Sequence, residues 1–223
     1  SIHTAVIINN DIKRAFKIPT NAVKLFDSHT FYVLFQSYFS INKIELKTNT
    51  DIAIASVVPE FDEPICEMFD KYYKCHPYLI KCSKALKLKV KPELANIEEL
   101  GADRLANAEY CAEYFNDKNT IAIDCGTATT INIILKSGRF IGGIIMLGMR
   151  ISADALFSKT SKLKYTNLDD CDFNGLKLVG NSTESSVKAG ITFGYCCAID
   201  GLLDRILNEF KNTKFQFIGS GGY

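Results

Sequence analysis

The chain has 223 residues, 47% of them hydrophobic, so it can bury a substantial core as one large or two small domains. Its 26 basic and 25 acidic residues are interspersed and give a formal net charge of +1. This balance argues against a nucleic-acid partner or a polybasic membrane patch, and the sequence contains no signal peptide or apolar run of membrane length.

The eight cysteines are irregularly spaced and form no CxxC pair. Several lie in apolar runs, where a reduced cysteine behaves as a small hydrophobic residue. Cys75 stands beside His76, but no second pair has ligand spacing, so a surface loop is favoured over a metal site. We therefore expect reduced thiols and a cytoplasmic location.

The first half of the chain alternates strand and helix patterns. A hairpin is expected from strands over 2–8 and 12–18 with a turn between them. Further along we expect a mainly helical segment over 20–39, a buried strand over 51–59, a helix over about 64–74 and a strand with one exposed face over 81–91.

The second half continues this alternation. An amphipathic helix is predicted within 97–115, and the polar stretch 116–119 then breaks the pattern. We place a domain boundary there, giving domains 1–116 and 117–223. The later elements expected are a strand and glycine turn over 140–149, a helix over 151–160, a helix over 183–210 and a strand over 215–218. The helix over 183–210 could be interrupted near Gly190 or Gly194. Such alternation favours an α/β fold.

The segment 121–134 is the most informative part of the sequence. It is an apolar run broken by Asp124, Gly126 and a group of threonines, which predicts a strand, a tight turn and a second strand. Glycine lets backbone N–H groups approach an anion, and Thr127 and Thr129 add hydroxyl groups. Asp124 ends a buried strand and needs a cation or hydrogen bonds. The alternative is an ordinary hairpin whose aspartate caps the turn.

One hairpin pattern occurs twice in the sequence. Residues 1–6 align with 130–135, and each segment then passes through a polar turn into a returning strand. The first copy begins just after the place where its acidic, glycine-containing turn would stand. We therefore expect a short strand of the form apolar-Asp-x-Gly-x-Thr before Ser1.

Duplicated hairpins with an acidic phosphate turn resemble the superfamily of actin, sugar kinases and heat-shock ATPases. Within it, six ordered motifs resemble those of type III pantothenate kinases. They are Ser56–Pro59, Gly101–Arg104 with Asn107–Ala108, Asp124–Thr130, Gly142–Ile144 with Gly148, Thr183 with Gly190–Ile191, and Ser220–Gly222. Each motif is weak alone, whereas six in order are specific.

The resemblance implies two ribonuclease H-like domains that face each other across a nucleotide cleft. It also implies ATP-dependent phosphorylation of pantothenate to 4'-phosphopantothenate, the first step of coenzyme A biosynthesis. The cofactors would be ATP, Mg²⁺ and a monovalent cation, K⁺ or NH₄⁺, and the expected assembly is a homodimer.

The same resemblance implies roles for individual residues. Asp103 would be the proton acceptor, and Gly101, Ala102, Asp103, Arg104 and Thr183 would contact pantothenate. Asp124 would help to hold the monovalent cation, and the ATP-binding residues would be Gly126, Thr127, Thr129, Gly221 and Gly222. Simpler alternatives are a surface ion pair or helix cap for Asp103 and Arg104, an N-cap for Thr183 and a plain turn for Gly221–Gly222.

The chain departs from the family pattern at four positions. Leu94 replaces a tyrosine that contacts pantothenate, Ile97 and Leu147 replace prolines, and Ser182 replaces an asparagine. Losing one phenol hydrogen bond costs about 0.5 to 1.5 kcal/mol, so we expect an active kinase with an altered pocket. The alternatives are a non-catalytic nucleotide-binding regulator and a kinase for another small hydroxy or sugar substrate.

Overall fold

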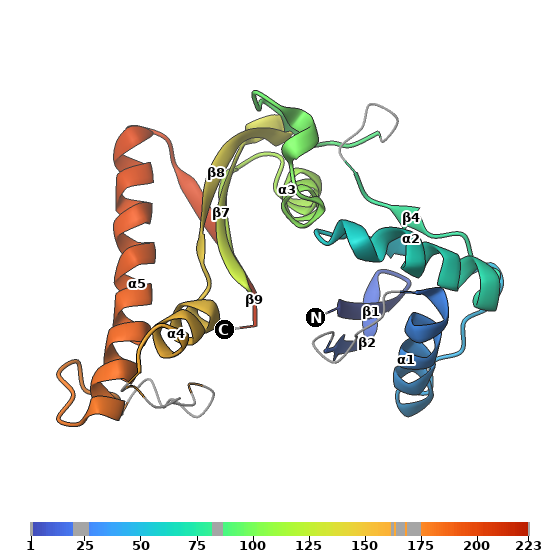
Figure 1. Cartoon of the computed structure of the whole chain (residues 1–223). Helices are drawn as coiled ribbons and strands as arrows, with labels where there is room; N and C mark the ends of the chain where they lie inside the picture. Colours follow the sequence, from blue (N-terminus) through green and yellow to red (C-terminus); the bar gives the residue numbers. More distant parts are fainter. Residues whose placement is uncertain are drawn as a thin grey trace. The chain divides into compact units, whose positions relative to one another are not determined.

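The computed structural model describes residues 2–19, 27–81, 87–161, 163, 168 and 175–222 (Figure 1). The chain divides into two compact units, one of residues 1–83 with 98–106 and the other of residues 84–97 with 107–223. We call them unit 1 and unit 2. The domain boundary placed after residue 116 stays a prediction.

Unit 1 begins with the predicted hairpin. Strands β1 (Ile2–Ile8) and β2 (Asp11–Ile18) pair antiparallel, with a bulge between Val6 and Ile7. Asn9 and Asn10 have φ values of 52° and 64°, the left-handed conformation that a two-residue hairpin turn requires and that asparagine tolerates.

Helix α1 (Ser28–Ile41) accounts for the predicted helical segment, whose residues 20–26 lie outside the described part of the chain. Phe31, Phe35 and Phe39 recur at helical spacing and are buried in the unit 1 core. That core also contains Ile18 from β2 and Ile65 and Met68 from helix α2 (Pro59–Met68).

The prediction for 51–59 was wrong in two respects. Only β3 (Ala53–Ile54) forms a strand there, parallel to β4 (Tyr78–Leu79), and its residues are half-buried or exposed. Pro59 begins α2 (Pro59–Met68), because the first turn of a helix needs no N–H from that residue. A π-helical turn, Phe69–Tyr73, follows α2.

Unit 2 is built on a five-stranded mixed sheet in the order β5-β8-β7-β6-β9. Strands β6 and β7 and strands β7 and β8 pair antiparallel, whereas β9 runs parallel to β6 and β5 parallel to β8. The bounds are β5 Lys91–Pro92, β6 Asn119–Cys125, β7 Ala128–Leu135, β8 Arg139–Leu147 and β9 Phe215–Gly221. Short 3₁₀ turns cover Ile97–Glu99 and Lys136–Gly138.

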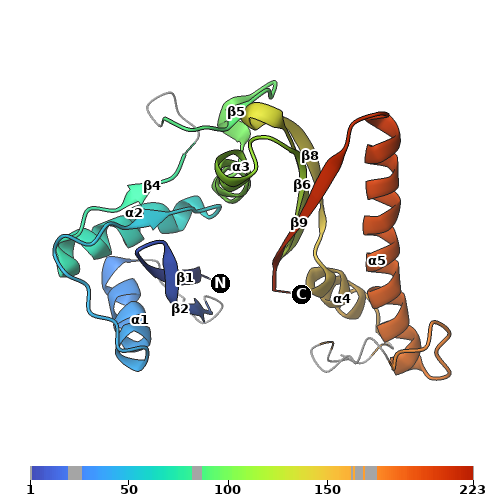
Figure 2. The same ribbon diagram turned by 180° about the vertical axis from the view of Figure 1, so that it is seen from behind.

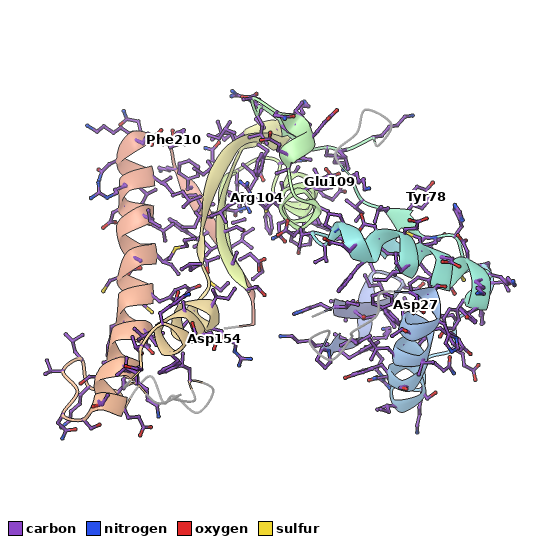
Figure 3. All side chains as sticks on the ribbon, viewed as in Figure 1. Asp27, Tyr78, Arg104, Glu109, Asp154 and Phe210 are labelled. Carbon is purple, nitrogen blue, oxygen red and sulfur yellow. The ribbon has the colours of Figure 1, made fainter. Side chains whose placement is uncertain are left out.

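Helices cover both faces of this sheet. Helix α5 (Thr183–Glu209) lies along one face and α3 (Ala102–Tyr114) on the other, while α4 (Met149–Ser158) follows β8 (Figures 1 and 2). Ile121, Ile131 and Ile133 form a core with Ile206 of α5. At the end of α5, Phe210, which is labelled in Figure 3, packs edge-on against Phe215 of β9 with ring centroids 5.8 Å apart.

Most expected elements of unit 2 are confirmed, but two details differ. Helix α5 continues through Gly190 and Gly194, where we had allowed for an interruption. Residues 87–90 are not a strand, and the sheet gains only the two residues of β5; residues 82–86 lie outside the described part. No helix within the described ranges is long and apolar enough to cross a membrane.

Candidate active site

The predicted phosphate turn joins β6 to β7 in unit 2. Thr127 and Ala128 are exposed, and the N–H of Gly126 donates to the carbonyl of Ala128 at 3.2 Å. A Cβ placed on Gly126 would meet only that carbonyl, at 3.5 Å, so the space beside this glycine is open. The turn therefore offers exposed backbone and a hydroxyl group to an incoming anion.

Three other glycines pack against the turn from neighbouring segments. Gly148, before α4, donates to the carbonyl of Thr127 at 3.1 Å, and Gly222 donates to the carbonyl of Cys125 at 3.1 Å. A Cβ on Gly148 or Gly221 would come within 2.2 Å of a backbone oxygen of the turn. The structure thus brings Gly126, Gly221 and Gly222 together, and the close approaches at Gly148 and Gly221 explain why glycine is needed at those two positions.

Asp124 lies beside this turn and is half-buried. Its Oδ1 accepts a hydrogen bond from the hydroxyl of Ser220 at 2.9 Å, because Ser220 stands opposite it on the parallel strand β9. Carboxylate and hydroxyl oxygens are ligands that hard cations prefer. Ser220 belonged to a motif that the sequence singled out, but its contact with Asp124 depends on the pairing of β6 with β9.

Thr129 lies on the other face of the sheet from Asp124. Side chains alternate along a strand, so Thr129 shares its face with Ile131 and Ile133, which pack under α5. Its hydroxyl is fully buried and lies 2.5 Å from the hydroxyl of Tyr195 in α5. Nothing in the sequence linked these residues, which are 66 positions apart.

Thr183 is the exposed first residue of α5. The N-cap is Ser182, not Thr183, and it forms a capping box in which its hydroxyl accepts from the N–H of Ser185 at 3.1 Å. The hydroxyl of Thr183 therefore does not serve as the helix cap. Thr183 lines an open cavity of about 1070 Å³ within unit 2, together with Ser186 and Tyr195.

The other lining residues come from β8, from α4 and the segment after it, and from the first half of α5. They are Met146, Ser152, Leu156, Leu163, Gly180, Asn181, Ser182, Val187, Gly190, Ile191, Gly194 and Ala198. All are apolar or neutral polar residues, so this cavity suits an uncharged part of a ligand.

The predicted substrate motif 101–104 belongs to unit 1 and forms the start of α3. The carbonyl of Gly101 accepts the first helical hydrogen bond, from Leu105 at 2.9 Å, and Asp103 lies in the first turn. A Cβ on Gly101 would lie 2.6 Å from Oδ1 of Asp103 and 3.7 Å from a methyl carbon of Val57. Two predicted motifs, 56–59 and 101–104, therefore meet here.

The charges of this motif suit an anionic ligand. Burial lowers the pKa of Arg104, and the neighbouring carboxylate of Asp103 acts in the opposite direction. An arginine remains protonated at physiological pH despite such a shift, so Arg104 supplies a permanent positive charge. The helix N-terminus adds a partial positive charge at the same place.

Leu94, which replaces the expected tyrosine, lies over the glycine pair of β8. Its Cδ2 is 4.0 Å from a Cβ placed on Gly142. The preceding segment is fixed, since Glu93 accepts two hydrogen bonds from Arg139 at 2.6 and 2.9 Å and Glu109 accepts from the N–H groups of Lys89 and Val90. An apolar side chain is therefore held where a phenol was expected.

Within the described ranges, no group of three or more His, Cys, Asp or Glu side chains could hold a metal ion. Mg²⁺ in nucleotide sites keeps several waters and few carboxylate ligands, so Mg²⁺ bound with a nucleotide would need few ligands from the protein. The carboxylate of Asp124 and the hydroxyl of Ser220 form a pair of oxygen groups beside the turn.

A mixed α/β fold with an acidic, glycine-lined turn at the end of a sheet strand is typical of proteins that bind nucleotide phosphates. The family model for type III pantothenate kinases matches residues 1–205. The chain therefore belongs to the type III pantothenate kinase family.

Similar curated proteins agree with this assignment. The type III pantothenate kinase of Legionella pneumophila (strain Corby) is 33% identical over 223 residues, which is 100% of this chain and 84% of that protein. Those of Persephonella marina and Desulfosudis oleivorans are 34% and 35% identical, covering 91% and 85% of this chain and 78% and 72% of theirs.

Among solved structures, a conserved Baf family protein from Campylobacter jejuni has a TM-score of 0.47 and 16% identity, covering 83% of this chain and 73% of that one. Similarity at this level does not establish a shared fold.

Proposed function

We propose that this protein transfers a phosphoryl group from ATP to pantothenate and so forms 4'-phosphopantothenate, the first step of coenzyme A biosynthesis. The observation that carries this assignment is the Asp103 carboxylate placed over Gly101 at the start of α3, in a chain of the type III pantothenate kinase family. The proposed arrangement is two ribonuclease H-like domains of the actin and sugar-kinase superfamily that face each other across the nucleotide.

Phosphoryl transfer needs positioning and charge neutralisation more than a strong base, because its transition state is loose. The exposed Thr127 with its hydroxyl group and the open space beside Gly126 and Gly222 support binding of the ATP phosphates there. Mg²⁺, bound with ATP, would neutralise phosphate charge. K⁺ or NH₄⁺ would be held by Asp124 with help from Ser220.

Asp103 is proposed to accept the proton of the pantothenate hydroxyl as the phosphoryl group is transferred. A carboxylate suits this role, since it accepts a hydrogen bond from the hydroxyl group first and takes the proton late. Arg104 would pair with the carboxylate of pantothenate or with the transferring phosphoryl group. Thr183 would contact the uncharged part of pantothenate from the rim of the cavity.

The test is ADP formation by the complete protein with and without pantothenate, in K⁺ and then in Na⁺ buffer. We expect turnover that depends on pantothenate and is stimulated by K⁺. Asp103→Asn should lower kcat by about 10² to 10⁴ while leaving ATP binding intact. Asp51→Asn, a change at an exposed aspartate in the same unit, is the matched control.

Other outcomes would redirect the assignment. Turnover with another small hydroxy compound in place of pantothenate would assign a different acceptor. Because Leu94 stands where the family has a pantothenate-contacting tyrosine, such compounds are the first alternative substrates to test. ATP binding without turnover would favour a regulatory role. Unaltered phosphorylation by Asp103→Asn would remove Asp103 from the mechanism. The homodimer and the cytoplasmic location are further parts of this proposal.

A further inference from the structure

Tyr195 connects the phosphate turn to the cavity beside Thr183. Its hydroxyl lies 2.5 Å from Oγ1 of Thr129, while its side chain lines the cavity that Thr183 also lines. Because Thr129 stands directly opposite Cys125 in the β6–β7 pair, both residues present their side chains to the α5 face of the sheet. These two residues flank the turn of Gly126 and Thr127.

The phenol is suited to hold this position as a neutral group. Burial, together with a hydrogen bond to Cys125, raises the pKa of Tyr195 to about 12. Thr129 is fully buried, and it faces away from the side of the sheet that carries Asp124. Through its hydroxyl group Thr129 can hold the start of β7 from the α5 face of the sheet, and Tyr195 is the partner of that hydroxyl group.

We propose that Tyr195 is a positioning residue for the nucleotide: its hydroxyl group, acting through Thr129, holds the turn 125–128 in the shape that binds the phosphates of ATP. This inference rests on the proposed function only in taking that turn as the phosphate site. It also changes the role predicted for Thr129, from a direct ATP contact to a support for the turn.

The test compares Tyr195→Phe, Thr129→Val and the double variant in the complete protein, by calorimetric titration with ADP and by the KM values for ATP and pantothenate. Tyr195→Phe should weaken ADP binding and raise the KM for ATP about threefold to tenfold, because it removes the hydroxyl group that meets Thr129 and Cys125. The KM for pantothenate should stay within about twofold, since the phenylalanine ring still lines the cavity.

Three comparisons separate positioning from a general effect on folding. The double variant should bind ADP about as tightly as the single variant that has the lower ADP affinity, because both changes remove the contact between Thr129 and Tyr195. Thr129→Ser, which keeps the hydroxyl group, should bind ADP nearly as the unchanged protein does. Tyr78→Phe, at a tyrosine that is 72% exposed in unit 1, is the control for loss of a phenol hydroxyl.

Unchanged ADP affinity in Tyr195→Phe would overturn the inference. The inference would also be overturned if the KM values for ATP and pantothenate rose equally while the melting temperature fell. It would be overturned as well if the losses of ADP affinity in the two single variants multiplied in the double variant. If Tyr195→Phe fails to fold, the ADP affinities of Thr129→Val and Thr129→Ser test the inference instead. Equal affinities in these two variants would overturn it. Protein that binds ADP without phosphorylating pantothenate would refute the kinase assignment but still allow the ADP comparison, whereas protein that binds no nucleotide would refute both.

Discussion

At the scale of single residues, the site depends on where glycine lets another group approach. The carboxylate of Asp103 occupies the space where a side chain of residue 101 would begin. A Cβ placed on Gly101 would lie 2.6 Å from Oδ1 of Asp103. The obstacle is the end of a side chain, which can rotate away at little cost. A methyl group at this position would therefore affect the direction of the carboxylate more than the stability of the fold.

We expect Gly101→Ala to lower kcat by about tenfold to a hundredfold, because a displaced carboxylate no longer accepts the substrate proton in line. The melting temperature should change by no more than about 2 °C. Steady-state kinetics with a thermal melt measures both quantities. A melting temperature that falls together with kcat would show that Gly101 serves the fold and not the orientation of Asp103.

At the scale of elements, the phosphate turn is held by segments that are distant in the sequence. The backbone of Gly148 and of Gly221 lies against the turn at distances that leave no room for a Cβ, and the N–H of Gly222 donates to the carbonyl of Cys125. Here the obstacles are backbone carbonyls, which cannot rotate away alone. The turn, the start of α4 and the end of β9 must therefore shift together or not at all.

Gly148→Ala should therefore damage both nucleotide binding and stability. We expect a loss of about 1 to 3 kcal/mol in the free energy of unfolding, the usual cost of overpacking, and at least about tenfold weaker ATP binding. Chemical denaturation and nucleotide titration measure these effects. Gly219→Ala is the matched control, since a Cβ there meets nothing within 4 Å; similar losses in both variants would contradict the explanation.

Helix α1 provides a pH-dependent prediction in unit 1. Asp27, which is labelled in Figure 3, accepts a hydrogen bond from the N–H of Thr30 at 2.8 Å, and this hydrogen bond lowers the pKa of the Asp27 carboxyl below its ordinary value. A lowered pKa in the folded state stabilises the protein above the pKa of the unfolded state. That stabilisation is lost as the pH falls through the folded-state pKa.

We expect Asp27→Ala to melt a few degrees below the unchanged protein at pH 7, because α1 loses its N-cap. The difference should narrow as the pH falls below about 4, the ordinary pKa of an unfolded aspartate, and on through the lower pKa of Asp27 in the folded protein. Thermal melts at several pH values, with Asp51→Ala as the control for loss of an exposed carboxylate, check this. A difference that stays constant down to pH 2 would rule out the charged cap.

At the scale of the whole molecule, the repeat seen in the sequence corresponds to two hairpins of the same kind. β1 with β2 and β7 with β8 both pair antiparallel, and each pair has an irregularity, between Val6 and Ile7 and between Ile133 and Ile134. Each unit thus contains one such hairpin.

The expected homodimer is a prediction at this scale. Along α5, a Cβ on Gly190, Gly194 or Gly201 would meet nothing within 4 Å, so this row leaves the helix surface open to close approach. Light scattering should give twice the chain mass of 24.9 kDa. Gly201→Leu, at the member of the row that does not line the cavity, should shift the mass towards the monomer, and an unchanged dimer would place the interface elsewhere.

The sequence alone determined the α/β class, most element positions and the glycine-containing turns, because these depend on local periodicity and on residues with unusual backbone freedom. It was wrong where a local pattern allows two outcomes: Pro59 can end a strand or begin a helix, and tertiary packing favours the helix. The continuity of α5 through Gly190 and Gly194 likewise depends on the support that its length receives from the sheet.

Only the tertiary structure decided which side of the sheet each site residue faces and what it touches. Asp124 meets Ser220 and Thr129 meets Tyr195 because strand pairing and helix packing join residues 96 and 66 positions apart. Such contacts arise when distant segments bury apolar surface together, a free energy that belongs to the assembled fold and leaves no local signal in the sequence.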